Sequence, residues 1–326
     1  MLDFIKKRYG IIVSILLILL FGFYIFYDSQ KMRLYPETFS FADLYVNVKI
    51  YEKNPARAKK ALQEIKKIYN KYEKLIVEKE GNHTEAYIQN NQIEEKKVEI
   101  DPTLYNVLSY AKKIYNKNNK YTILKDGVEL LQKYPKEEVP KEALETLKSM
   151  EELNFPSTNT IENNHLHIDI RFLSLAFANQ EVKKYSEKEN LSSYLVNASG
   201  MMLIGKHYGT GKYKIGLEDS SHTYYKNLEL ENSTLATTGE SVQSFTYNGQ
   251  KYAGWIDPDT HKPVDTFKNV TVIGKDPLTI HSLSQILYFL SIEEGKQFLK
   301  DFSFTEVIWQ KQNGEVVSYQ NMQKAT

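Results

Sequence analysis

Cysteine is absent from the 326-residue chain. Its absence excludes disulfide bonds, thiolate metal sites, cysteine nucleophiles and a cysteine-linked lipid anchor. Arginine is scarce, because almost all of the 42 basic residues are lysines, and this leaves few guanidinium groups to read phosphates or bases. The net charge of +1 gives no chain-wide basic field. We therefore expect no nucleic-acid partner.

Several common catalytic motifs are also missing. The chain has no glycine-rich phosphate loop ending in Gly-Lys-Ser/Thr, no Gly-x-Gly-x-x-Gly and no His-Glu-x-x-His. Two of its seven histidines, His165 and His167, would share a face of a strand. Two histidines alone are a weak metal signal, and a polar strand edge is the preferred interpretation.

The longest apolar run lies at the N-terminus. Residues 11–27 carry no charge and follow Lys6, Lys7 and Arg8. The run is near the lower length limit for crossing a bilayer, and it ends in aromatic residues rather than the small residues of a cleavage site. A retained anchor is therefore favoured over a cleaved signal peptide or a buried core helix. The basic cluster places the N-terminus in the cytoplasm.

These observations divide the chain into five parts. We expect a cytoplasmic N-terminus over 1–10, a transmembrane anchor over 11–27, a linker over 28–37, an extracytoplasmic domain over 38–320 and a tail over 321–326. The protein would then sit in the cell membrane through one N-terminal helix.

The first half of the outer domain reads as a strand followed by helices. Alternation predicts a strand over 44–51. Asn54-Pro55 and Asp101-Pro102 have the N-cap and proline of helix starts, and 135–150 suggests a third short helix. Residues 80–98 and 154–166 are polar and read as connections.

The second half is richer in strands. Short β-type runs occupy 193–197, 212–217, 227–230, 251–256 and 269–273, with two more at 305–311 and 316–319. Helices are expected from Asp276-Pro277 to about residue 290 and after Ser291, which has capping-box spacing to Glu294. Without regular βαβ alternation, this order indicates an α+β domain on antiparallel sheet.

Four segments then occur in an order typical of a known family. They are Ile168-Asp169-Ile170 before a helix around Ala176-Phe177-Ala178, then Val196-Asn197-Ala198-Ser199-Gly200, then Ala236-Thr237-Thr238-Gly239, and Ile256-Asp257-Pro258-Asp259-Thr260-His261-Lys262-Pro263-Val264. Together they resemble the FAD:protein FMN transferase family, also called the ApbE family. The fourth segment is the most specific, and the likeness covers about residues 38–320.

The resemblance implies a fold and an activity. The fold would be ApbE-like, or T-fold-like, with antiparallel sheets and packed helices. Family members move FMN from FAD onto a serine or threonine of a target protein, and Mg²⁺ is expected to neutralise the developing charge. FAD is accordingly the expected cofactor, and an unidentified protein the expected partner.

This sequence departs from the family pattern at the positions that the resemblance assigns to metal and flavin binding. The family's metal-holding Asp and Thr correspond to His281 and Gln285, which are poorer ligands for Mg²⁺. Its paired glycines after Leu-Asp-Leu become Arg171 and Phe172, and the first glycine of its Asn-x-Gly-Gly turn becomes Ser199. The resemblance thus describes a divergent member with altered catalytic and metal-binding motifs.

The expected site follows residue by residue from this likeness. His281 and Asp257 are the catalytic candidates, with a turn role preferred for Asp257. His281 and Gln285 are the metal candidates. The candidate flavin-binding residues are Asn197, Gly200, Thr237, Thr238, Gly239 and Arg171.

Three functions stay open at this point. The preferred hypothesis is a membrane-anchored family member with reduced or lost transferase activity that acts through flavin or partner binding. The second is an active flavin transferase. The third is a structural cell-envelope protein in which bulky replacements such as Arg171 and Phe172 fill the cleft.

Overall fold

A computed structural model of the protein describes residues 16–24, 26–28, 30–77, 96–135, 139–162, 164–257 and 259–320. Its centre is an eight-stranded antiparallel sheet. The strand order is β1 (Arg33–Phe41), β2 (Leu44–Glu52), β5 (Tyr194–Ala198), β6 (Met201–Ile204), β9 (Ser233–Gly239), β12 (Phe267–Gly274), β13 (Glu306–Lys311) and β14 (Val316–Gln320). The predicted mixture of helices and antiparallel sheet is confirmed.

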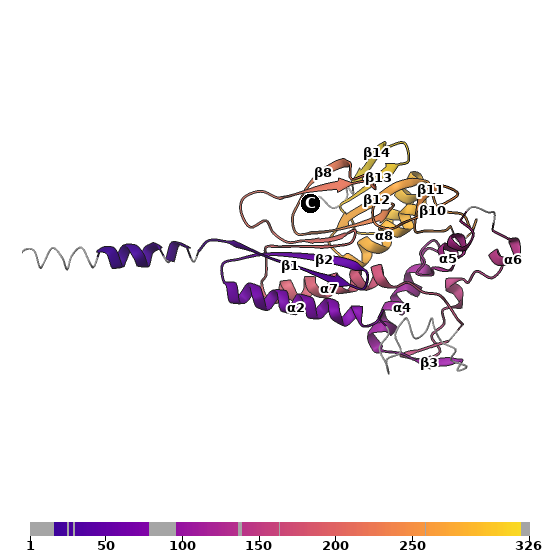
Figure 1. Ribbon diagram of the computed structural model, residues 1–326, viewed down its shortest axis with the longest axis horizontal. Helices are drawn as coiled ribbons and strands as arrows, with labels where there is room; N and C mark the ends of the chain where they lie inside the picture. The colour runs from indigo at the N-terminus through magenta and orange to yellow at the C-terminus, as the bar shows by residue number, and fades with distance from the viewer. Residues whose placement is uncertain are drawn as a thin grey trace, which may run out of the picture.

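Helices and small two-stranded sheets surround this centre (Figure 1). The helices are α2 (Pro55–Glu73), α4 (Pro102–Tyr115), α5 (Asp126–Lys133), α6 (Lys141–Leu144), α7 (Arg171–Lys188), α8 (Pro277–Phe289) and α9 (Ile292–Phe298). The strand pairs are β3 (Lys97–Glu99) with β4 (Thr160–Glu162), β7 (Tyr213–Glu218) with β8 (Tyr224–Leu230), and β10 (Ser244–Tyr247) with β11 (Gln250–Ala253).

The two faces of the large sheet bury different partners. Along β2, Val46, Val48 and Ile50 point into the main core, where α2, α7 and α8 cover the sheet. Alternate side chains of β9 and β12, such as Leu235 and Ile273, meet the β7–β8 pair on the opposite face. Because side chains alternate across a strand, neighbouring residues of β9 belong to different layers.

The helix starts follow the capping signals of the sequence. Asn54 Oδ1 accepts from the backbone amides of Ala56 and Arg57 at 2.9 and 3.2 Å. Asp101 and Asp276 cap α4 and α8 in the same way, and both are followed by proline. Each cap satisfies amides that the helix itself leaves unpaired.

The helix expected over 135–150 is wrong. Among the described residues of this range, the structure has the four-residue α6 and the start of a short 3-10 turn at Met150–Glu152. Pro140 immediately precedes α6, and a proline cannot continue a helix from the residues before it. The helix that the sequence missed is α5, which begins earlier, at Asp126.

Other differences concern the ends of elements. β1 begins at Arg33, so it overlaps the segment 28–37 expected as a linker. Residues 78–95 lie outside the described residues, as do 1–15 and 321–326, so most of the loop expected over 80–98 is not described. β3 occupies the end of that loop.

The N-terminal apolar run is described only from residue 16. Residues 16–24 are helical, and Figure 1 shows them extending away from the sheet. In the described ranges, no helix combines the length and the apolar character needed to cross a membrane. The anchor expected over 11–27 is therefore unconfirmed.

A buried hydroxyl joins the two longest helices of the core. Tyr69 of α2 is fully buried, and its Oη donates to Oδ1 of Asn179 in α7, which is also fully buried. The Tyr69 ring packs edge-on against Phe39 and Phe41, with ring centroids 5.4 and 6.0 Å away. This position therefore ties α2 to both α7 and β1.

Tyr69→Phe should keep the ring packing but leave the Asn179 carbonyl buried without its donor. We expect a loss of about 2 kcal/mol in the free energy of unfolding, measured by urea denaturation. Tyr45→Phe, at a residue that is 73% exposed, is the control and should change stability by less than about 0.5 kcal/mol. Equal values for the two variants would contradict the role given to Tyr69.

Candidate functional site

Three adjoining hollows lie where α5, α8 and the segment after β11 meet. We call them the Asp257 cavity, the His281 cavity and the Gly239 recess, with volumes of about 320, 180 and 20 Å³. Trp255 lines all three, and Thr122 lines the two larger ones. Trp255 is therefore a wall residue that the three hollows share.

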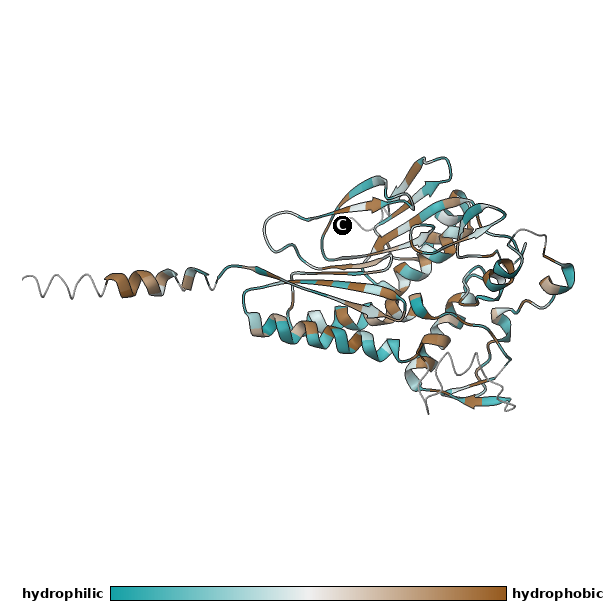
Figure 2. Ribbon diagram, viewed as in Figure 1, coloured by the Kyte–Doolittle hydropathy of each residue, from teal (hydrophilic) through white to brown (hydrophobic). Residues whose placement is uncertain are grey.

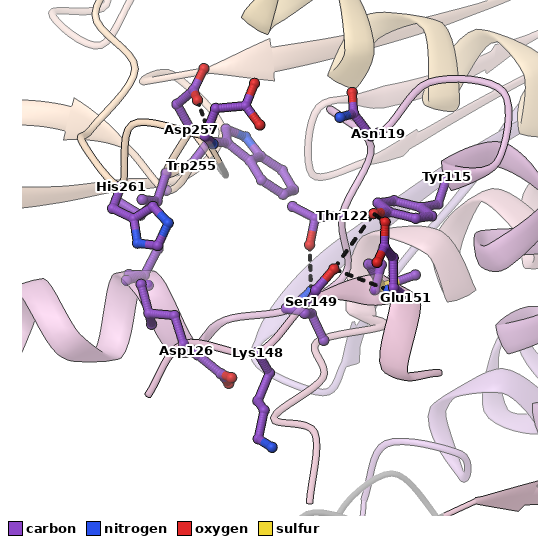
Figure 3. Close-up of a pocket in the computed structure, with 18 residues that line it drawn as sticks. Tyr115, Asn119, Thr122, Asp126, Lys148, Ser149, Glu151, Trp255, Asp257 and His261 are labelled. Carbon is purple, nitrogen blue, oxygen red and sulfur yellow. Dashed lines mark hydrogen bonds between the residues drawn. The ribbon is translucent and has the colours of Figure 1, made fainter. Parts of the chain in front are cut away.

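The Asp257 cavity is open enough for part of a small ligand. Figure 3 shows the Trp255 indole reaching into it from the side of Asp257, with Tyr115, Ser149 and Glu151 on the opposite wall. An aromatic face and several hydroxyl and carboxylate groups are typical of a ligand pocket.

Asp257 is held in a turn and in an ion pair. Its Oδ1 accepts from the backbone amides of Asp259 and Thr260 at 2.8 and 3.1 Å, and its Oδ2 accepts from Lys120 Nζ at 2.8 Å. Burial raises the pKa of Asp257, but these donors outweigh burial and bring the pKa below its usual value. An ionised carboxylate that already has three donors is a weak proton acceptor. The turn role preferred from the sequence agrees with this geometry.

Lys120, the partner of Asp257, was not predicted from the sequence. Its ammonium also contacts Asp259 Oδ2 at 2.8 Å, and its side chain is only 18% exposed. Since Asp257 and Lys120 are 137 residues apart, only the folded chain reveals the pair.

His281 lies at the junction of the His281 cavity and the Gly239 recess. It is 7% exposed on the inner side of α8. Burial alone lowers its pKa to about 4. The imidazole is therefore neutral near pH 7 and aims into the hollow as an uncharged group.

Gln285 is one helical turn beyond His281, and its side-chain amide is already hydrogen-bonded within the protein. Its Nε2 donates to the backbone carbonyl of Thr122 at 2.6 Å, and the side chain is 1% exposed. A neutral imidazole and an amide engaged in this way do not suit a hard cation such as Mg²⁺, which requires near-octahedral oxygen ligands. The residues present at the family's metal position therefore do not fit Mg²⁺.

The two threonines of the Thr237-Thr238-Gly239 segment point to opposite faces of the sheet. Thr238 Oγ1 is 2.9 Å from Ser284 Oγ in α8, whereas Thr237 Oγ1 is 2.9 Å from Thr271 Oγ1 under the β7–β8 layer. Only Thr238 thus presents its hydroxyl on the side of His281.

Position 239 requires glycine because of its backbone conformation and its close contact with the neighbouring strand, and not because of a ligand. Its φ is +151°, and an added Cβ would lie 2.2 Å from the Lys268 carbonyl oxygen. The recess beside it holds about the volume of one water molecule. Phe172, in place of a family glycine, is among its walls.

Gly200 borders this recess, since its neighbours Ser199 and Met201 line it, whereas Asn197 lies away from it. An added Cβ on Gly200 would come within 2.6 Å of the Val242 side chain, so the close approach there is made by the protein. Asn197 is exposed on the face of β5 that carries Leu195, opposite the buried Val196 and Ala198. The structure therefore does not bring Asn197 together with His281.

Arg171 lines the His281 cavity but is already paired. Its Nη2 is 2.6 Å from Asp169 Oδ2, and its Nη1 donates to Asp43 Oδ2. The hydrogen bonds that the guanidinium donates to Asp169 and Asp43 raise its pKa. Two carboxylates neutralise the cation, which weakens its attraction for a diphosphate.

The two histidines noted in the sequence do not share a strand face. His165 has a left-handed backbone with φ of 54°. His167 instead faces α5, and its Nδ1 is 2.9 Å from Glu129 Oε2. The strand face expected for the pair is therefore wrong, and the contact between His167 and Glu129 was not predicted.

The buried neutral His281 makes stability depend on pH. The unfolded chain binds a proton near pH 6.5, whereas the folded chain does not until about pH 4. Stability from this residue is therefore fully present above about pH 6.5 and falls as the pH drops towards 4.

Substituting His281→Gln should remove this dependence. Between pH 6.5 and 4, the wild type should lose about 3 kcal/mol more than the variant, as measured by chemical denaturation at each pH. His222→Gln, at a side chain that is 90% exposed, is the matched control and should follow the wild-type curve. Parallel curves for the wild type and His281→Gln would show that the imidazole is not buried and neutral.

Comparison with known proteins gives the same fold. Solved ApbE proteins from Pseudomonas stutzeri and Thermotoga maritima superpose with TM-scores of 0.70 and 0.73 at 17% identity. The superpositions cover 90% and 89% of this chain, and 96% and 97% of those proteins. At this identity the likeness shows the fold alone.

Sequence comparison gives shorter matches to characterised relatives. The FAD:protein FMN transferases of Vibrio cholerae and Haemophilus influenzae are each 25% identical, over 42% and 40% of this chain. The matches span 44% and 39% of those proteins, less than half their length. The model of the ApbE family matches residues 43–309, which is most of the chain. This chain therefore belongs to the ApbE family.

Proposed function

We propose that the protein is a flavin-nucleotide-binding member of the ApbE family with lost or much reduced transfer of FMN. The observation that carries the proposal concerns two side chains of α8. Gln285 is hydrogen-bonded to Thr122, and His281 is buried and neutral. The side chains at the family's metal position thus offer no anionic oxygen.

Binding of a flavin is supported by the two larger cavities. Trp255 and Thr122 line both cavities, and Asp257 lines the larger of the two. An indole supplies a flat face on which a flavin ring can stack. The curated relatives are FAD:protein FMN transferases, which makes a flavin nucleotide the first ligand to test.

Loss of transfer is supported by three features of the site. The metal position lacks a carboxylate, Arg171 is neutralised by Asp169 and Asp43, and the Gly239 recess has room for about one water. Phosphoryl-type transfer depends on charge stabilisation at the reacting phosphate. With that stabilisation missing, a bound flavin would remain unreacted.

The expected outcome is flavin binding without flavin transfer. The full chain in detergent would be mixed with FAD, Mg²⁺ and a peptide that carries the family's acceptor serine or threonine. We expect quenching of FAD fluorescence, no mass gain of FMN on the peptide, and transfer in a parallel reaction with the Vibrio cholerae enzyme. Trp255→Ala should weaken FAD binding at least about tenfold, a loss typical of one aromatic stacking contact.

The control for that variant is Tyr208→Ala. Tyr208 is 46% exposed and stacks on Tyr51, outside the three hollows. A mass gain of FMN on the peptide would establish an active transferase and overturn the proposal. The absence of any FAD binding would instead favour a structural cell-envelope protein with an occluded cleft.

We further propose that the N-terminal segment anchors the domain outside the membrane. The support is the uncharged run over 11–27 after three basic residues. Large apolar side chains of residues 16–24 are more than half exposed, and Figure 2 shows this helical segment as hydrophobic. Such exposure is unfavourable in water and suits a lipid environment.

Anchoring predicts that the full chain stays in the membrane pellet after alkaline carbonate extraction. The outer domain should be digested by protease added outside intact cells. Replacing Leu17 and Leu20 by lysine should release the protein, because charges within the run oppose insertion. Replacing the exposed Leu34 by lysine, outside the run, is the control. Extraction of the unmodified chain would contradict the proposal.

A further inference from the structure

Three potential metal ligands converge beside the two larger cavities. Asp126 and Glu129 lie three residues apart in the first turn of α5, so they share a helix face. His167 belongs to the segment before α7 and is held opposite them by the backbone. The amide of Lys125 donates to the His167 carbonyl at 3.0 Å, and the amide of Asp169 donates to the Ile123 carbonyl at 2.7 Å.

The ligand atoms of this group are close together. One atom from each of Asp126, Glu129 and His167 lies within 4.8 Å of the other two. His167 Nδ1 is 2.9 Å from Glu129 Oε2 and 3.8 Å from Asp126 Oδ1. Small side-chain movements would therefore bring all three to bonding distance of one ion.

Asp126 Oδ1 is a buried oxygen that accepts no hydrogen bond from any described residue. The Asp126 side chain is 14% exposed, whereas those of His167 and Glu129 are 50% and 43% exposed. A buried carboxylate oxygen without a donor is costly. A cation bound there would satisfy it.

An ordinary ion pair explains only part of the arrangement. Lys125 Nζ lies 3.2 Å from Glu129 Oε1, and His167 contacts the other oxygen, Oε2. These contacts account for Glu129. They leave Asp126 Oδ1 without a hydrogen bond, and its one contact within this group is the 3.8 Å approach of His167 Nδ1.

We propose that Asp126, Glu129 and His167 bind one divalent transition-metal ion, with Zn²⁺ favoured and Mn²⁺ as the second choice. Imidazole with carboxylates suits these ions better than Mg²⁺ or Ca²⁺, which prefer oxygen ligands alone. Three protein ligands also leave a coordination position open, as in catalytic zinc sites.

The position of the site suggests what the ion would meet. Asp126 lines the Asp257 cavity and Glu129 lines the His281 cavity. The ion would lie at the rim shared by both, where a phosphate of a bound nucleotide could complete its coordination. This role rests on the proposed flavin binding, whereas binding of the ion does not.

The test is calorimetric titration of the chelator-treated full chain in detergent, without flavin, with Zn²⁺, Mn²⁺ and Mg²⁺ in turn. We expect one Zn²⁺ per chain, with Mg²⁺ bound at least about tenfold more weakly. Asp126→Asn, Glu129→Gln and His167→Gln should each weaken Zn²⁺ binding by about tenfold or more. Circular dichroism of each variant would confirm that it is folded.

The chain offers a matched control in a second histidine–carboxylate pair. His222 Nδ1 lies 3.3 Å from Glu218 Oε2 on the surface. Among the residues that the structure describes, no third potential ligand joins this pair. His222→Gln and Glu218→Gln should leave Zn²⁺ binding unchanged. Absence of Zn²⁺ binding by the wild type, or binding by the three site variants as tight as that of the wild type, would overturn the proposal. Because flavin is omitted, a failure here is separate from any failure of flavin binding.

Discussion

The contact on which the site depends is the packing of α8 against the sheet and against the Thr122 segment. Ser284 bonds Thr238 of β9, and the Gln285 amide bonds the Thr122 carbonyl. These two contacts hold α8 between the sheet and Thr122, which lines both larger cavities. They also use the helix face on which the family places its metal ligands. Under the proposed function, the same residues that stabilise the fold here leave no carboxylate at the position where the family resemblance expects a metal.

The altered positions reinforce one another. A neutral His281 and a paired Arg171 leave little positive charge for a diphosphate to meet, and the Gln285 amide already donates to Thr122. The cluster of Asp126, Glu129 and His167 would supply such a charge from α5 instead of α8. A cleft with a nucleotide site and with its cation at α5 in place of α8 would favour binding of the nucleotide over transfer of FMN.

Local signals in the sequence predicted much of the fold. The caps at Asn54, Asp101 and Asp276 and the alternation along β2 act over a few residues, so the sequence alone identifies them. The helix over 135–150 was wrong and α5 was missed, because the prolines and short apolar pattern there fit several local structures. The order of the family motifs, rather than composition, brought His281 and Gln285 forward as candidates.

The partners of the site residues could not be predicted in this way. Gln285 meets Thr122, Lys120 meets Asp257, and Arg171 meets Asp43 across more than one hundred residues. Such pairs arise only from the folded topology. For the same reason, His167 was seen as half of a histidine pair, and its carboxylate neighbours on α5 were not seen.

The most direct measurement of the central claim is the affinity of the full chain for FAD with Mg²⁺ and with a chelator in its place. If His281 and Gln285 leave no Mg²⁺ site, the two dissociation constants should agree within about twofold, a difference of less than about 0.5 kcal/mol. If Mg²⁺ increased the affinity for FAD by about tenfold and the increase persisted in Asp126→Asn, this result would contradict the account. The ion would then be held at α8 and not at the α5 cluster.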